Sequence, residues 1–303
     1  MISGVGWHER DLCMTAIREF APAKVNLTLE VEGRRADGFH ELASLVTFAS
    51  VGDVVMLDPE AASGIRVTGP FADRLEGTNI LNRAISLLRE RAPVLTLGAV
   101  HIEKRLPVAA GLGGGSADAG AFLRAVRRAN GEASVGVDWL GIAQALGADV
   151  PACLAARPLW MTGIGEALTE LSGGLPPLAA LLVNPMVDVP ADKTGRVYRV
   201  LAAEPLPAGH RVCTAPRISD RTDLLAFMQA RGNQLARAAE AVVPEIGAVL
   251  KALRRQPAIE HAAVSGGGPT CFGVFPNRAA VDAARLELTA EHPTWWVEAV
   301  QLG

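Results

Sequence analysis

The sequence predicts an α+β protein with two domains, and three observations support this prediction. Apolar and polar residues alternate along several short segments near the N-terminus, which is the pattern of half-buried strands. Amphipathic helical patterns precede and follow a glycine-rich segment at residues 109–120. The segment "SGGLPP" at residues 172–177 interrupts these patterns before a second mixed set begins. Because the strands form hairpins and do not alternate steadily with helices, an α+β fold is favoured.

The interruption at residues 172–177 is the expected domain boundary. A first domain is predicted at residues 20–172 and a second at residues 173–303. Residues 1–19 contain acidic residues and lack the apolar stretch of a secretion signal. We therefore expect a disordered or loosely docked extension there.

The first domain is predicted to open with an antiparallel sheet, because residues 23–31 have one apolar and one polar face. The apolar positions are Val25, Leu27, Leu29 and Val31, and the polar positions are Lys24, Asn26, Thr28 and Glu30. The pair Asp37-Gly38 favours a tight turn. Further strands are predicted at residues 41–48, 52–58 and 64–69.

Helical patterns lie on both sides of the glycine-rich segment. Residues 78–92 predict a helix, and residues 99–106 return to strand alternation. After the glycines, four apolar residues recur at helical spacing: Ala119, Phe122, Leu123 and Val126. They predict a helix with Ser116 near its N-cap. Residues 137–146 predict a further helix.

The second domain is expected to mix strands and helices as well. Its predicted order is a strand, an irregular segment rich in proline and aspartate, a helical region, two strands around a glycine turn, a helix and a last strand. The corresponding residues are 178–185 for the first strand, 224–255 for the helical region, 261–275 for the paired strands, 279–290 for the helix and 295–302 for the last strand.

Composition and charge exclude several classes of function. The net charge is −3 and only 5% of the residues are aromatic, so a basic nucleic-acid-binding surface is not expected. No apolar run is long enough to span a bilayer, and a cytoplasmic protein is expected. Neither a metal site nor a disulfide framework is predicted, because the histidines show no metal-binding spacing and the cysteines are scattered. The cysteines are Cys13, Cys153, Cys213 and Cys271.

The segment "AAGLGGGSADAG" at residues 109–120 stands between a predicted strand and a predicted helix. The first N–H groups of a helix have no partner within the helix, and the helix dipole adds partial positive charge there. Since glycines also let the backbone approach an anion closely, a phosphate-binding loop is favoured over a flexible linker. No lysine follows Gly115 as in a Walker A motif, and the dinucleotide fingerprint does not fit either.

Four motifs resemble those of the GHMP kinases, in the order that the family shows. "LPVAAGLGGGSADAG" is similar to the central phosphate loop of the family, and "VSGGGPTCFGVF" to its third glycine motif. "FAPAKVNLTLEVEGRRADGFHEL" and "LGADVPACL" resemble motifs of one group within the family, whose substrate carries a cytidine diphosphate. The resemblance runs from about residue 20 to about residue 275. It implies a two-domain fold with a mixed or antiparallel N-terminal sheet, covering helices, and a ferredoxin-like C-terminal domain.

The resemblance further implies an ATP-dependent kinase that phosphorylates the 2-hydroxyl of a cytidine diphosphate-linked sugar alcohol, on the non-mevalonate route to isoprenoid precursors. The residues that would hold the ATP phosphates are Pro107, Val108, Ala109, Ala110, Gly111, Leu112, Gly113, Gly114, Gly115, Ser116 and Ala117. Mg²⁺ is expected to arrive with ATP, because no carboxylate cluster suggests a metal site in the protein. The expected partners are these two small molecules, without nucleic acid or membrane, in a monomer or homodimer.

Two residues match catalytic positions of the family. Asp149, in "GADVP", matches the aspartate that takes the hydroxyl proton, and Lys24 matches a lysine beside it. A cation at this place keeps the aspartate ionised and lowers the pKa of the attacking hydroxyl. The residues alone leave two alternatives, in which Asp149 caps a helix that starts near Pro151 and Lys24 is an exposed lysine on a strand.

The resemblance also assigns substrate-binding residues, namely Asn26, Phe39, His40, Tyr198 and Gly267. Phe39 would stack on the cytosine, His40 would pair with its polar edge, and Tyr198 would supply a second stacking face. Asn26 lies on the strand face of Lys24 and would bond the base or the substrate. Gly267 replaces a serine that is common in the third motif, and we expect activity to tolerate it. A core Phe39 and a surface His40 are the alternative interpretation.

Two other functions remain open at this point. A GHMP kinase for homoserine, mevalonate or a sugar is disfavoured by the P-A-K-x-N-L and R-A-D-G-F-H segments. A catalytically silent relative that binds nucleotide as a sensor or scaffold is disfavoured because Lys24, Asp149 and the glycine loop are all present.

Overall fold

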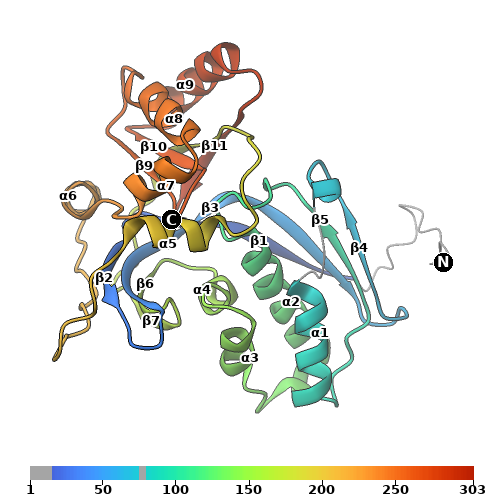
Figure 1. Cartoon of the computed structure of the whole chain (residues 1–303). Helices are drawn as coiled ribbons and strands as arrows, with labels where there is room; N and C mark the ends of the chain where they lie inside the picture. Colours follow the sequence, from blue (N-terminus) through green and yellow to red (C-terminus); the bar gives the residue numbers. More distant parts are fainter. Residues whose placement is uncertain (1–15, 75–79) are drawn as a thin grey trace.

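The computed structural model describes residues 16–74 and 80–303 (Figure 1). Two lobes share one sheet, which has eleven strands within these residues. The N-terminal lobe contains β1 to β7 and α1 to α4, and the C-terminal lobe contains β8 to β11 and α5 to α9. The first fifteen residues of the predicted extension, and the first two of the helix predicted at 78–92, lie outside the described residues.

The sheet of the N-terminal lobe is built around its longest strand, β3. The strands of this lobe are β1 (Ile17–Asn26), β2 (Glu30–Arg34), β3 (His40–Asp58), β4 (Gly64–Thr68), β5 (Ala99–Glu103), β6 (Leu159–Gly163) and β7 (Ala167–Glu170). β3 pairs antiparallel with β1, β2, β5 and β6. β1 begins three residues before the predicted start of the first domain.

The prediction of separate strands at residues 41–48 and 52–58 is wrong, because β3 runs through both without a break. At Gly52 the strand lies directly against the backbone of Ala21 and Pro22, where β1 shifts register. A side chain at this position would collide with that backbone. The glycine therefore permits a bend in one strand, where the sequence pattern suggested a turn between two.

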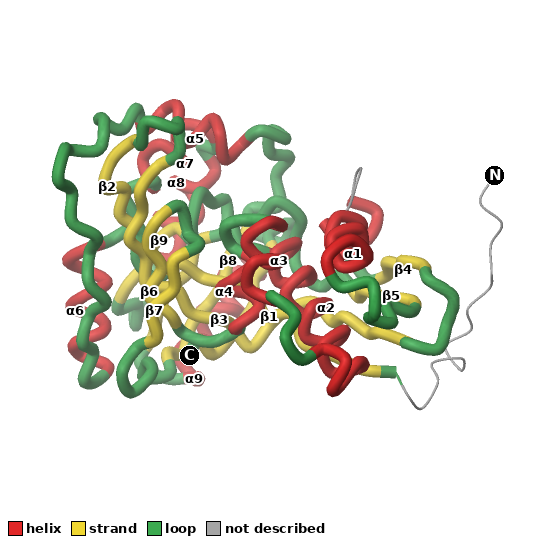
Figure 2. Tube along the Cα trace, turned by 90° about the horizontal axis from the view of Figure 1, so that it is seen from below, coloured by secondary structure: helices red, strands yellow, loops and turns green. Residues whose placement is uncertain are grey.

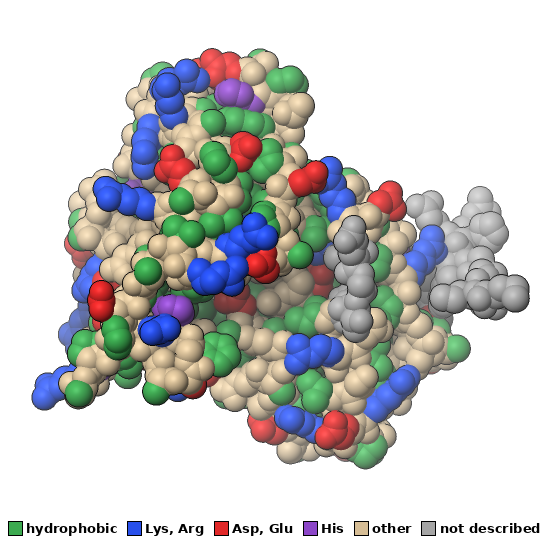
Figure 3. Space-filling view, in the orientation of Figure 1, with side chains coloured by type: hydrophobic (Ala, Val, Ile, Leu, Met, Phe, Trp, Pro, Cys, Tyr) green, Lys and Arg blue, Asp and Glu red, His purple; other side chains and the backbone are tan. Residues whose placement is uncertain are grey.

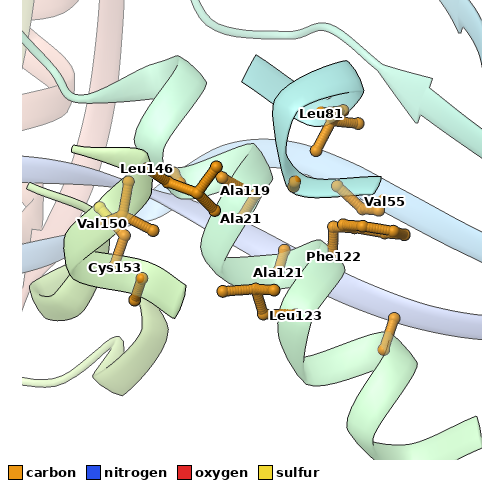
Figure 4. Packing of buried hydrophobic residues seen from close by; sticks show 14 of the residues in the cluster. Ala21, Val55, Leu81, Ala119, Ala121, Phe122, Leu123, Leu146, Val150 and Cys153 are labelled. Atoms are coloured by element: carbon orange, nitrogen blue, oxygen red, sulfur yellow. The ribbon is translucent and has the colours of Figure 1, made fainter. Parts of the chain in front are cut away.

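Helices cover one face of this sheet, as the view from below shows (Figure 2). They are α1 (Ile80–Arg91), α2 (Gly114–Asn130), α3 (Trp139–Leu146) and α4 (Val150–Ala155). The apolar residues predicted for α2 are confirmed as core, and Phe122 and Leu123 are fully buried among side chains of α1, α3 and α4 (Figure 4). α2 approaches α4 closely at Gly120, where a Cβ would lie 2.6 Å from the carbonyl carbon of Cys153. This contact holds the first half of α2 against α4.

The C-terminal lobe has the chain order β-α-β-β-α-β, with several helices in the first crossover. Its strands are β8 (Leu178–Asn184), β9 (His261–Val264), β10 (Cys271–Phe275) and β11 (Trp296–Leu302), and its helices are α5 (Lys193–Leu201), α6 (Arg221–Arg231), α7 (Ala236–Val242), α8 (Glu245–Arg254) and α9 (Arg278–Glu291). The strand order is β11-β8-β10-β9, with antiparallel neighbours. This is the ferredoxin-like arrangement, and the predicted fold class is confirmed. Leu302 of β11 pairs with Ala49 of β3 and joins the lobes.

Three elements are not predicted by the sequence pattern: β6, β7 and α5. β6 is entirely buried and lacks the alternation that marks a half-buried strand, and the short β7 pairs with it. α5 lies in the segment predicted as irregular, between the two lobes (Figure 1). Its apolar Val197 and the stem of Lys193 are buried, so packing stabilises a helix that proline and aspartate residues nearby obscure in the sequence.

Candidate active site

A cavity of about 1230 Å³ lies between the two lobes. Residues of β1, of the start of β3, of the loop before α2, of α5 and of the loop before β10 line it. The surface is visibly hollowed there, and basic side chains gather along its upper rim (Figure 3). The cavity is large enough for two ligands of nucleotide size, since single ligand pockets hold roughly 300–1,000 Å³.

Lys24 and Asp149 meet in this cavity. Lys24 Nζ donates to Asp149 Oδ1 at 2.6 Å, and the lysine side chain is 4% exposed whereas that of Asp149 is 39% exposed. Asp149 occupies the N-cap position of α4, but its side chain makes no capping bond. The cap alternative for Asp149 and the exposed alternative for Lys24 are therefore both wrong. Their catalytic roles stay predictions.

In the central loop (residues 107–113), four consecutive carbonyl oxygens accept hydrogen bonds from donors outside the loop. Ala109 O accepts from Lys193 Nζ, Ala110 O from Thr270 N, Gly111 O from Ser265 Oγ and Leu112 O from Lys24 N, at 2.9–3.1 Å. In a trans peptide the C=O and the next N–H point in opposite directions. The N–H groups of residues 110–113 are thus turned away from these anchors. Ala110 N–H closes the turn at Val108–Ala109, and those of residues 111–113 have no hydrogen-bond acceptor among the described residues. They form a row of free donors.

α2 continues this row of donors. Gly113 is its N-cap in the left-handed conformation, with φ 63° and no side-chain cap. The prediction that Ser116 lies near the N-cap needs correction, because the helix begins at Gly114 and Ser116 is already in its first turn. The uncapped N–H groups and the helix dipole favour an anion at this end.

Beneath the start of α2 lies a buried charge cluster that the sequence pattern does not predict. Lys104 Nζ donates to Asp118 Oδ2 at 2.7 Å and also to Asp53. Asp53 Oδ1 accepts from the N–H groups of Arg105 and Leu106. Burial lowers the pKa of Lys104, but the two carboxylates outweigh burial and raise it; burial raises the pKa of Asp118. The only signal in the sequence was a lysine at a core-facing position of a strand.

Three of the residues that the resemblance assigns to the substrate, Phe39, His40 and Tyr198, also line the cavity. They form what we call its nucleoside end. Asp37 and Gly38 form the predicted turn between β2 and β3, with Phe39 N donating to Asp37 Oδ1. His40 stacks on Tyr198 of α5 with ring centroids 4.5 Å apart, and Phe39 is 57% exposed. Both alternative assignments therefore need correction, since Phe39 is not in the core and His40 is half-buried.

Burial is the main cause of two pKa shifts at the nucleoside end of the cavity. Burial and then the charge of Arg34 lower the pKa of His40, so its ring is neutral at physiological pH. Burial and then the charge of Asp149 raise the pKa of Tyr198 to about 12. Both side chains are thus uncharged hydrogen-bonding groups with aromatic faces.

Asn26 and the C-terminal glycine loop (residues 265–270) close the cavity between these two ends. Asn26 is buried, its N–H donates to Ser265 Oγ, and its side chain donates to Ser44 Oγ at 2.8 Å. Gly267 lines the cavity, and a Cβ there would meet no atom within 4 Å. The backbone turn thus leaves open space at the position that often carries serine.

The residues present fit a metal ion that is carried by ATP. No group of three or more His, Cys, Asp or Glu side chains is placed for a metal within residues 16–74 and 80–303. Mg²⁺ keeps several waters and is commonly bound through substrate phosphates and one or two protein oxygens. Ser116 and Asp149 line the cavity and offer such oxygens. Over the same residues, no helix has the length and apolar character needed to cross a membrane.

Comparison with known proteins agrees with the predicted family. The models for the GHMP kinase N-terminal domain and the GHMP kinase C-terminal domain match residues 79–157 and 217–294. The chain is 44% identical to the 4-diphosphocytidyl-2-C-methyl-D-erythritol kinase of Dinoroseobacter shibae over 283 residues, 93% of each chain.

Solved structures give the same result. A crystal structure of 4-(cytidine 5'-diphospho)-2C-methyl-D-erythritol kinase matches with a TM-score of 0.72 and 33% identity, over 95% of this chain and 99% of that one. Homoserine kinase from Cytophaga hutchinsonii matches with a TM-score of 0.62 at 18% identity, over 99% and 97% of the two chains, and shares the fold. This chain therefore belongs to the GHMP kinase family, in the group of 4-diphosphocytidyl-2-C-methyl-D-erythritol kinases.

Proposed function

We propose that this protein transfers the γ-phosphoryl group of ATP to the 2-hydroxyl of 4-diphosphocytidyl-2-C-methyl-D-erythritol, on the non-mevalonate route to isoprenoid precursors. The observation that carries the proposal is that one cavity holds the Lys24–Asp149 pair between a row of free backbone donors and an aromatic cluster. These are the three parts that phosphoryl transfer to a nucleotide-bearing alcohol needs: a phosphate cradle, a base and a nucleoside site.

The partly exposed Asp149 is the base in this proposal. Its Oδ2 is not used by the ion pair, so it accepts the proton of the substrate hydroxyl as that oxygen attacks the γ-phosphorus. The bond from phosphorus to the β,γ-bridging oxygen breaks, and ADP leaves with the electron pair. Lys24 cannot swing away because it is buried, and its charge stays beside the reacting oxygen throughout.

The central loop and the start of α2 bind the ATP phosphates through the N–H groups of residues 111–113 and the first turn of the helix. Mg²⁺ bound with ATP would neutralise phosphate charge, and Ser116 in the first turn of α2 is the residue whose hydroxyl would help to hold it.

The substrate's cytosine lies against Phe39 and Tyr198, with His40 at its polar edge. Because His40 stacks on Tyr198 in this structure, the base enters by displacing that ring contact or by stacking on its open side. We further propose that the protein works in the cytoplasm on these small molecules, as a monomer or homodimer.

A coupled ADP-release assay tests the proposal. The cytidine diphosphate substrate should support turnover, whereas homoserine, mevalonate and galactose should not. Faster turnover with one of those three acceptors, or protection against thermal unfolding by homoserine or mevalonate but not by CDP, would contradict the assigned substrate. Nucleotide binding without turnover on any acceptor would contradict the kinase activity itself.

A further inference from the structure

Lys193, the first residue of α5, lies buried at the point where the two glycine loops meet. Its Nζ donates to Ala109 O of the central loop at 2.9 Å and to Gly268 O of the C-terminal glycine loop. The side chain is 6% exposed and also lines the cavity. No carboxylate forms an ion pair with it in the part of the chain that the structure describes.

Burial of an ammonium group is unfavourable when carbonyl oxygens bond it and no carboxylate pairs with it. A functional reason for the position of Lys193 is therefore expected. Burial lowers the pKa of Lys193 to about 8. The chain has only four lysines among its 29 basic residues, and three of them, Lys24, Lys104 and Lys193, are buried and line this cavity. Lysine is thus used in this protein mainly at the site, and arginine elsewhere.

The two carbonyls that Lys193 holds belong to loops in direct contact. Gly111 packs on Gly268 so closely that a Cβ would lie 2.5 Å from Gly268 O. Ala109 adopts a left-handed conformation, with φ 56°, that is unfavourable for a residue with a side chain. The bond from Lys193 therefore offsets local strain and fixes the Ala109–Ala110 peptide, whose N–H closes the turn that leads into the free donors of residues 111–113.

The same helix carries Tyr198, five residues along, at the nucleoside end of the cavity. We propose that Lys193 is a positioning residue that clamps the central loop to the C-terminal glycine loop and ties both to the helix of the nucleoside site. The clamp keeps the first N–H donors of the phosphate cradle aimed at ATP. This inference rests on the proposed function and adds to it a residue that orients the cradle through its carbonyls.

Replacement by methionine, K193M, keeps most of the side-chain volume and removes the three donors. K251M is the matched control, because Lys251 is exposed on α8. The readouts are the affinity for a non-hydrolysable ATP analogue, the affinity for CDP, and kcat. We expect K193M to lower the affinity for the ATP analogue and to lower kcat, each by roughly 10- to 100-fold. This is the size of effect expected for the loss of a charged hydrogen bond. CDP affinity should change by less than about threefold, and K251M should behave as wild type.

The conservative variant K193R retains donors and charge, and should recover most of the lost affinity for the analogue. K193Q, a shorter neutral donor, should be intermediate, and these two variants decide the question if K193M does not fold. An ATP-analogue affinity within twofold of wild type in folded K193M or in K193Q would overturn the proposal. A loss confined to CDP would also overturn it, since Lys193 would then contact the substrate instead of orienting the loop. Binding of the analogue does not depend on which alcohol is phosphorylated, so failure of the proposed function is recognised separately.

Discussion

Lys24 and Asp149 are 125 residues apart in the chain and 2.6 Å apart in the structure, with the lysine buried and the aspartate partly open to the cavity. The asymmetry matters chemically. The closed lysine is a fixed positive charge, and the open aspartate can accept a proton from a ligand. Each would have an ordinary structural explanation alone, and only their contact makes them a candidate catalytic pair.

Replacement of Asp149 by asparagine is expected to lower kcat by roughly 10²- to 10⁴-fold, because the amide cannot take the hydroxyl proton. K24M should also lower kcat, through loss of charge beside the reacting oxygen. The two variants should differ in stability. D149N leaves a buried ammonium without its carboxylate, whereas K24M leaves a carboxylate that water can reach. Thermal unfolding should therefore show the larger loss for D149N, and full turnover of either variant would contradict the assigned roles.

Two glycine substitutions are expected to differ sharply. In G111A the new Cβ would meet Gly268 O at 2.5 Å at a residue with φ 80°, so the two loops must separate. The affinity for an ATP analogue should fall at least tenfold. In G267A the Cβ meets nothing within 4 Å and the backbone needs no unusual φ, so activity should stay within about twofold. Calorimetric titration with the analogue and steady-state kinetics check both expectations.

Substitutions in the aromatic cluster are expected to raise KM for the cytidine substrate and to leave KM for ATP nearly unchanged. F39A and Y198A should each raise KM for the substrate by roughly 5- to 150-fold, the range expected for loss of one stacking contact of about 1–3 kcal/mol. KM for ATP should change little. Y198F keeps the ring and removes the hydroxyl, and serves as the control. Equal increases in both KM values would show that the cluster supports the cavity as a whole and not the base.

The stability of the protein should depend on pH through Lys193. Its folded-state pKa of about 8 lies below the ordinary value of 10.5, because burial disfavours the charged form. Between these values the unfolded chain binds more protons than the folded one, so this residue makes the free energy of unfolding increase as pH rises from about 8 to 10.5. K193M lacks this dependence. Urea unfolding of both proteins should show that the free energy of unfolding of K193M minus that of wild type falls by on the order of 2–3 kcal/mol across that range. A constant difference would mean that Lys193 titrates normally.

Substitutions of the two carboxylates that pair with Lys104 should differ in their effect on the stability of the protein. Asp53 accepts from Lys104 and from two backbone N–H groups, so D53N turns an amide donor toward donors and should destabilise the protein by about 3–5 kcal/mol. Asp118 Oδ1 has no hydrogen-bond partner, and burial raises the pKa of this carboxyl. D118N presents a neutral group of the same shape and leaves Lys104 paired with Asp53, so its effect should stay below about 1 kcal/mol. Denaturant unfolding of the two variants measures the difference.

Much of this arrangement follows from local patterns in the chain. The helical spacing after the glycines and the Asp37-Gly38 turn depend on interactions within a few residues, and the structure has them as expected. The glycine segment indicates an anion site for the same reason, because a strand, a stretch of glycine backbone and the start of a helix follow one another directly in the chain. The single half-buried strand predicted at residues 23–31 is wrong, because β1 ends at Asn26 and β2 begins at Glu30, and the predicted polar face is buried at Lys24, Asn26 and Thr28. The family resemblance adds the roles that no local pattern states.

Long-range contacts decide the rest. A lysine on a strand is exposed unless a distant group compensates its burial, and the partners of Lys24, Lys104 and Lys193 include groups 125, 51 and 75–84 residues away along the chain. The orientation of the central loop likewise depends on anchors from β1, α5 and the C-terminal glycine loop. Burial and charge pairing are properties of the folded chain, because the desolvation of each lysine is balanced only after all these segments have come together.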